Sequence, residues 1–265
     1  MEVPADVATV TGIFLRAVDD SAPGLVRGLH LRGSLGFGEY FPGRSDVDFV
    51  AILSGRPDRG QLAALAVAHA QVRDAVPEPP LEGIHLLAED LGLPPADCPE
   101  VPYAFERSFH HAGRFELSPV TWHELAGHGV AVRGPALTSE DVWTDDAVLR
   151  AFSYANLTSY WADIARQLRA SRPGQLPANA TQWCVLGVSR LHHLLATGSM
   201  TSKSGGGRHA LAAFGPRWHP IITEALRLRE QPGDPSDYDA DPARRGRETT
   251  EFTAMAIEAG LALGP

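Results

Sequence analysis

The sequence contains little cysteine and no long apolar run, and each absence narrows the class of protein. Its two cysteines, Cys98 and Cys184, form no CxxC pair. A disulfide framework and a thiolate zinc site are therefore not expected. No apolar run approaches the length of a membrane-spanning helix. The N-terminal residues are acidic and lack the regions of a signal peptide, so we expect a cytoplasmic protein with no membrane partner.

Positive charge is also scarce. The 23 Lys and Arg residues against 32 Asp and Glu residues give a formal net charge of −9. Proteins that bind a nucleic-acid backbone need clustered Lys and Arg, so a nucleic-acid partner is not expected. Acidic clefts attract cations, so the balance is compatible with a small cationic substrate. The length of 265 residues fits one large domain or two small ones.

The first half of the sequence alternates between helix and strand patterns. Apolar residues at helical spacing predict helices over residues 4–18 and 61–75. Strands are predicted over residues 25–31, 46–53 and 81–87, with a short strand within 128–135. This alternation indicates an α/β domain, which we expect to cover residues 1–136.

Helical patterns dominate the second half, where we expect an all-α bundle over residues 137–265. Helices are predicted over residues 144–170, 181–197, 209–214, 219–229 and 249–263. Thr144 is the predicted N-cap of the first of these helices. The polar segment 231–247 contains three prolines and four aspartates and is predicted to be a mobile loop.

Two aspartates open the second predicted strand. Residues i and i+2 of a strand point to the same face, so the carboxylates of Asp46 and Asp48 converge. Adjacent carboxylates repel each other unless a cation lies between them, and Mg²⁺ commonly binds one or two carboxylates plus phosphate oxygens. Gly33 lets the backbone approach a phosphate, and the Ser34 hydroxyl can donate to it. The alternative is two solvated aspartates at the start of a strand, because Asp-x-Asp is common.

The order of these residues resembles a known motif. Gly33-Ser34 followed by Ser45-Asp46-Val47-Asp48-Phe49-Val50 is similar to the motif of the nucleotidyltransferase superfamily, above all the adenylyltransferases acting on streptomycin and spectinomycin. The resemblance implies that Asp46 and Asp48 bind Mg²⁺ and that Glu82 is the catalytic base. It also implies a nucleotidyltransferase domain with a mixed sheet, followed by a helical domain that closes the active-site cleft.

The second half carries a further part of the resemblance. Val188-Ser189-Arg190 and Ser202-Lys203 are similar to a segment of the family's helical domain, which implies that Arg190 and Lys203 bind the triphosphate of ATP. Without the resemblance, Arg190, Lys203 and Glu82 are ordinary exposed residues. The glycines that follow Lys203 are in the wrong order for a Walker loop, and a flexible linker is the alternative.

The antibiotic-binding residues of the family match this sequence less well. Ala180 occupies the position at which an aspartate is expected. Arg229 falls where the family has an aromatic residue against adenine, and a guanidinium can also stack on a base. Trp183 is more typical of a buried core residue than of a pocket wall. The choice of nucleotide is therefore less well determined than the chemistry.

The sequence as a whole predicts a Mg²⁺-dependent enzyme that transfers AMP from ATP to a hydroxyl of a small molecule, with a cationic aminoglycoside as the implied acceptor. One alternative keeps the chemistry and transfers AMP to a protein side chain or an RNA end. Another is a nucleotidyltransferase-fold regulator or antitoxin, against which the presence of all three carboxylates argues. The natural acceptor and the oligomeric state remain open.

Overall fold

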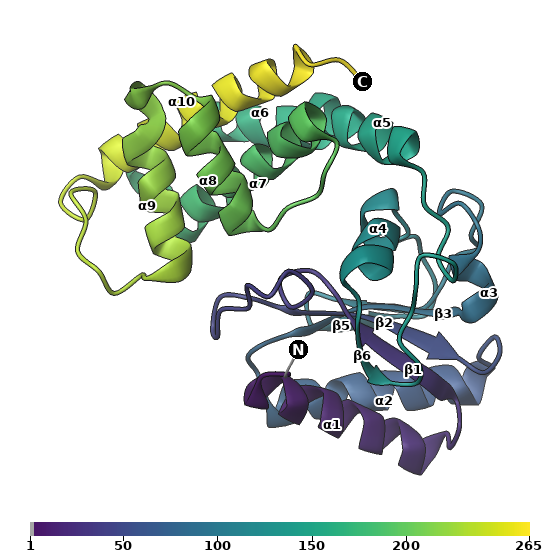
Figure 1. The fold of residues 1–265 in the computed structure, drawn as a ribbon. Coiled ribbons are helices and arrows are strands. Elements are labelled where there is room, and N and C mark those ends of the chain that lie inside the picture. The colour runs from purple at the N-terminus through teal and green to yellow at the C-terminus, as the bar shows by residue number, and fades with distance from the viewer. Residues whose placement is uncertain (1–2) are drawn as a thin grey trace. The chain divides into compact units, whose positions relative to one another are not determined.

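The computed structural model of the protein describes residues 3–265; the first two residues of the acidic N-terminal stretch lie outside this range. The chain forms two compact units that divide between Asp145 and Asp146. We call them the sheet unit and the helical unit (Figure 1). Whether they correspond to independent domains divided after residue 136 stays a prediction.

The sheet unit contains a six-stranded sheet with the order β5-β4-β3-β2-β1-β6. The strands are β1 Val26–Leu31, β2 Val47–Leu53, β3 Leu81–Leu87, β4 Tyr103–Phe105, β5 Ser108–His110 and β6 Val130–Arg133. Strands β2 and β3 are parallel and the other neighbours are antiparallel, which confirms the predicted mixed sheet. Strands β4 and β5 were not predicted, because three-residue strands are too short to show an alternating pattern.

Helices cover both faces of this sheet. On one face, α1 (Ala5–Ser21) and α2 (Arg59–Ala75) pack against the odd-numbered residues of β2, such as Phe49. On the other, α4 (Pro119–His128) packs its Trp122 near Val50 and Ile84, next to the short helix α3 (Ala88–Leu91) (Figure 1). Alternate strand residues point to opposite faces, so Asp48 and Glu82 belong to the α4 face.

Local signals set the starts of the helices on both faces. Asp58 accepts a hydrogen bond from the Gln61 amide, and the Gln61 side chain accepts one from the Asp58 amide, which forms a capping box at α2. Ser118 caps α4, and Pro119 follows at the first helical position, where its missing N–H costs no hydrogen bond. The Asp58 capping box therefore explains the start of α2, and Ser118 with Pro119 explains the start of α4.

The helical unit is a bundle around α7, which confirms the predicted helical second half. Its helices are α5 Asp146–Asn156, α6 Ala162–Ala170, α7 Ala178–Thr197, α8 Lys203–Ala213, α9 His219–Glu230 and α10 Pro242–Leu261. Helix α7 packs against α8, α9 and α10 around a core that includes Leu186, Ile221 and Phe252. A π-helical turn, Leu157–Trp161, joins α5 to α6.

Two predicted boundaries in the second half were wrong. The first helix begins at Asp146, so Thr144 is not its N-cap. The predicted loop over residues 231–247 ends earlier, because α10 begins at Pro242 with the Asp241 side chain accepting from the Arg244 amide. Aspartate at the N-cap and proline at the first position are helix-start signals, which the polar composition of the segment concealed.

The glycines after Lys203 form part of α8, so the interpretation as a flexible linker was wrong. A Cβ on Gly206 would lie 2.8 Å from the backbone nitrogen of Arg190, and one on Gly207 would lie 2.8 Å from Cδ2 of Leu186. Missing side chains therefore let α8 approach α7 closely, and this packing offsets the low helix propensity of glycine. Within residues 3–265, no helix has the length and apolarity to cross a membrane.

Candidate active site

Three carboxylates gather where β2 and β3 begin. The parallel register pairs Asp48 directly with Glu82, and Asp46, just before β2, lies close enough for its charge to act on Glu82. Burial and the charge of Asp46, with a smaller effect of Asp48, raise the pKa of Glu82 to about 7. The three groups therefore act on one another electrostatically, and such a cluster favours either a shared proton or a cation.

The loop after β1 brings the backbone against this cluster. Gly33 has a φ of 61°, and a Cβ on it would lie 2.2 Å from Oδ2 of Asp48. Both the conformation and the space therefore require glycine at this position. The loop then turns back, with the Glu39 amide donating to the Ser34 carbonyl at 2.9 Å. The Gly33 backbone is thus in contact with Asp48, and the role of Gly33 and Ser34 in phosphate binding stays a prediction.

A buried arginine, Arg32, which is not among the predicted site residues, also lies beside Asp48. The Arg32 guanidinium donates to Oε2 of Glu124 at 2.7 Å, pairs with Glu116, and lies 3.9 Å from Oδ1 of Asp48. The side chains of Arg32 and Glu124 are only 6% and 3% exposed, so water screens this pair little. One guanidinium therefore lies within 4 Å of three carboxylates, and carboxylate oxygens are ligands that Mg²⁺ binds in proteins.

Arg32 also connects the elements that surround the site. Its amide donates to the Asp48 carbonyl at 3.0 Å, which links β1 to β2, and its side chain reaches Glu124 on α4. Arg32 directly follows strand β1, and a charged residue at that position in the sequence could have indicated a functional role. Its carboxylate partners are 84 and 92 residues away along the chain, however, and no local pattern identifies partners at that separation.

The carboxylates at this edge suit a Mg²⁺ ion that takes part of its coordination from other molecules. Within residues 3–265, no three His, Cys, Asp or Glu side chains converge closely enough to hold a metal ion by themselves. Asp46 and Asp48 offer two carboxylates, and Mg²⁺ commonly completes such a pair with water and substrate phosphate oxygens. Asp46 and Asp48 therefore fit a Mg²⁺ ion that is also bound by phosphate oxygens better than a structural ion bound by protein ligands alone.

Both predicted triphosphate ligands belong to the helical unit, Arg190 to α7 and Lys203 to α8. Lys203 is the first residue of α8, directly after the N-cap Ser202, and the close approach of Gly206 brings this helix against the backbone of Arg190. A helix N-terminus favours anions through its N–H groups and its dipole. Lys203 is also the only lysine in the sequence.

Arg229 and Trp183, which were both considered as binding residues from the sequence, lie in or against the core of the helical unit. Arg229 is 1% exposed, so its side chain does not offer a surface to a base, and the stacking interpretation was wrong. Trp183 packs beside Trp161 with ring centroids 4.9 Å apart. This agrees with the interpretation of Trp183 as a core residue.

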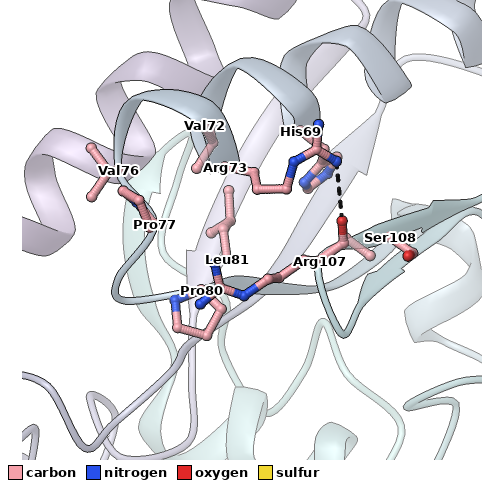
Figure 2. Close-up of a pocket in the computed structure, with 10 residues that line it drawn as sticks. His69, Val72, Arg73, Val76, Pro77, Pro80, Leu81, Arg107 and Ser108 are labelled. Carbon is pink, nitrogen blue, oxygen red and sulfur yellow. Dashed lines mark hydrogen bonds between the residues drawn. The ribbon is translucent and has the colours of Figure 1, made fainter.

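A small pocket lies on the opposite face of the sheet from the carboxylates. It is lined by residues of α2, among them His69 and Arg73, by Leu81 of β3, and by Arg107 and Ser108 of the β4–β5 hairpin (Figure 2). Because Asp48 and Glu82 belong to the α4 face, this pocket is not the place of the proposed chemistry. The β4–β5 hairpin lines this pocket with Arg107 and Ser108, and the amide of Glu106 in the same hairpin donates to Glu82.

Comparison with known proteins supports the fold. The crystal structure of spectinomycin adenyltransferase AAD(9) from Enterococcus faecialis with ATP and spectinomycin matches with a TM-score of 0.62 and 13% sequence identity. The match covers 94% of this chain and 98% of that chain. No family model and no curated protein matches the sequence. A mixed sheet followed by a helical unit is therefore an architecture that this chain shares with an adenyltransferase.

Proposed function

We propose that this protein is a Mg²⁺-dependent nucleotidyltransferase that transfers AMP from ATP to a hydroxyl group of a small molecule. The observation that carries the proposal is the pairing of Asp48 with Glu82 on neighbouring parallel strands, with Asp46 just before β2 acting on Glu82 and the Gly33 backbone against Asp48. The shared fold with an adenyltransferase supports the reaction class, and the excess of acidic charge supports a cationic acceptor such as an aminoglycoside.

Each predicted site residue has a separate role in the proposed phosphoryl transfer. Asp46 and Asp48 hold Mg²⁺, which when bound neutralises charge on the phosphate oxygens. The Gly33 and Ser34 region donates to the phosphates at the same edge. Arg190 and Lys203, in the helical domain proposed for residues 137–265, neutralise the triphosphate and the leaving pyrophosphate.

Glu82 is the proposed general base. Its raised pKa, about 7, gives the carboxylate enough proton affinity to accept the hydroxyl proton near neutral pH. As that proton moves to Glu82, the hydroxyl oxygen attacks the α-phosphorus and the bond to the bridging oxygen of pyrophosphate breaks. The products are an adenylylated acceptor and pyrophosphate.

The first experiment measures pyrophosphate release and the mass of the acceptor. The protein is incubated with ATP, Mg²⁺ and a panel of aminoglycosides and aminocyclitols, and a productive acceptor gains one adenylyl group. Glu82→Gln is expected to abolish turnover while calorimetry still detects ATP binding; Glu89→Gln, at an exposed residue of the same unit, serves as the control. Full turnover in Glu82→Gln contradicts the role of Glu82.

The same experiment separates the enzyme from its alternatives. Tight ATP binding without pyrophosphate release for any small-molecule or protein acceptor favours a nucleotide-binding regulator. An adenylyl mass on an added protein, with none on the small molecules, reassigns the acceptor and keeps the chemistry.

A further inference from the structure

The turn between β4 and β5 has an unusual backbone for its residues. Phe105 pairs with Ser108, which leaves Glu106 and Arg107 as a two-residue turn. Their φ angles are 46° and 63°. Two-residue hairpin turns with positive φ at both positions strongly prefer Asn-Gly, because these residues tolerate the left-handed region. A Glu-Arg pair adopts this conformation only if other contacts hold it.

This turn contacts the proposed base directly. The Glu106 amide donates to Oε1 of Glu82 at 2.9 Å, and within residues 3–265 the Glu82 side chain makes no other hydrogen bond. The rotation of a carboxylate about its last torsion is otherwise broad. A hydrogen bond to Oε1 selects one orientation and leaves Oε2 as the oxygen that can take a proton from an acceptor.

The opposite side of the turn is attached to α2 and the segment that follows it. The Arg107 guanidinium pairs with Glu78, and Nη1 of Arg73 donates to the Arg107 carbonyl at 3.4 Å (Figure 2). These contacts come from residues that precede β3, the strand that carries Glu82. The turn therefore contacts Glu82 of β3 through the Glu106 amide, and it contacts α2 and the α2–β3 segment through Arg107.

We propose that the Glu106-Arg107 turn is a positioning element for nucleotidyl transfer: the Glu106 amide orients Glu82, and Glu78 and Arg73 hold the turn that presents this amide. The inference rests on the proposed function, because it takes Glu82 as the base. It gives a reason for the unfavourable turn residues, since a base displaced by about 1 Å can lose about 100-fold in rate. Glu106 and Arg107 themselves do not touch the reacting atoms in this scheme.

A matched pair of turn variants tests the proposal. Glu106→Asn/Arg107→Gly keeps the amide and favours positive φ at both positions, whereas Glu106→Pro/Arg107→Gly removes the N–H and sets φ near about −65°. We expect the Asn-Gly variant to keep wild-type kcat and the Pro-Gly variant to lose about 100-fold in kcat with an unchanged KM for ATP. Equal loss in both variants, or full turnover in the Pro-Gly variant, overturns the proposal.

A milder variant covers the case in which the Pro-Gly protein does not fold. Glu78→Gln weakens the attachment of Arg107 without changing the turn residues. It is expected to lower kcat in the wild-type background and to have no effect in the Asn-Gly background, where the turn no longer needs the attachment. The same effect in both backgrounds contradicts a role of Glu78 through the turn.

An NMR measurement separates this inference from the proposed function. The Glu106 amide proton is expected to move upfield in Glu82→Ala, which lacks the accepting carboxylate, and to stay unchanged in Glu89→Ala. An unchanged resonance in Glu82→Ala overturns the contact even in an active enzyme. A protein that shows the shift but transfers AMP to no acceptor overturns the proposed function and, with it, the catalytic purpose of the turn.

Discussion

Glu82 owes its high proton affinity to burial and to Asp46, and this leads to a pH dependence of the reaction. A base works only when deprotonated, so kcat/KM is expected to rise with pH through about 7, the raised pKa of Glu82. Saturating Mg²⁺ offsets the charge of Asp46 and Asp48 and is expected to lower the midpoint of this rise. Rates measured from pH 5 to 9 at two Mg²⁺ concentrations test both expectations. A rate that is flat across this range contradicts them.

Arg32 stabilises the sheet unit because it compensates Glu124, which is nearly fully buried. Arg32→Ala leaves this carboxylate without its partner, so we expect the free energy of unfolding to fall by about 3–5 kcal/mol. Urea denaturation measures the change. Arg166→Ala, which removes an exposed ion pair with Asp163, is the control and is expected to change stability by less than about 1 kcal/mol. A double replacement of Arg32 and Glu124 by methionine is expected to recover most of the loss.

Lys203 offers a direct test of nucleotide binding because it is the only lysine in the sequence. A mild amine-reactive reagent therefore modifies this one side chain and the terminal amine, and ATP with Mg²⁺ is expected to protect it. Lys203→Ala is expected to weaken ATP binding by about 10- to 100-fold, the value of a charge-assisted hydrogen bond. Arg208→Ala, on the exposed side of α8, is the control in the calorimetric titration. Unchanged affinity in Lys203→Ala removes this residue from the triphosphate site.

At the scale of elements, the packing of α8 against α7 depends on Gly206. Alanine is the better helix former by about 1 kcal/mol, yet its Cβ at this position would lie 2.8 Å from the Arg190 backbone. Overpacking costs about 1–3 kcal/mol, so Gly206→Ala is expected to lower the free energy of unfolding. Gly127→Ala in α4, where the added Cβ meets open space, is expected to raise it. Thermal denaturation of the two variants shows whether packing or helix propensity determines the change in stability.

The strand and helix patterns of the sequence were informative where an element was long. Strands β2 and β3 and helices α1, α2 and α7 were predicted close to their observed bounds, because periods of about 2 and 3.6 residues reflect burial on one face. The hairpin β4–β5 was missed because its strands are short. The start of α10 was missed because proline and aspartate are common both at helix starts and in loops.

At the scale of the whole molecule, the sheet unit and the helical unit have separate hydrophobic cores. A fragment with its own core can fold alone, so we expect residues 146–265, expressed separately, to unfold in one cooperative thermal transition. Circular dichroism during heating measures this. A gradual loss of signal would show that the helical unit depends on the rest of the chain, and would argue against the predicted division into two domains.

The sequence by itself determined the order of the long elements and the Asp46, Asp48 and Gly33 motif, because these features depend on residues close together in the chain. Only the tertiary structure decided that Arg32 meets Glu116 and Glu124, and that the Glu106 amide reaches Glu82. It also decided that three consecutive glycines form a helix, because α7 lies against them. The contacts of Arg32 and of the Glu106 amide join residues 24 to 92 positions apart, and no local pattern or propensity encodes the pairing.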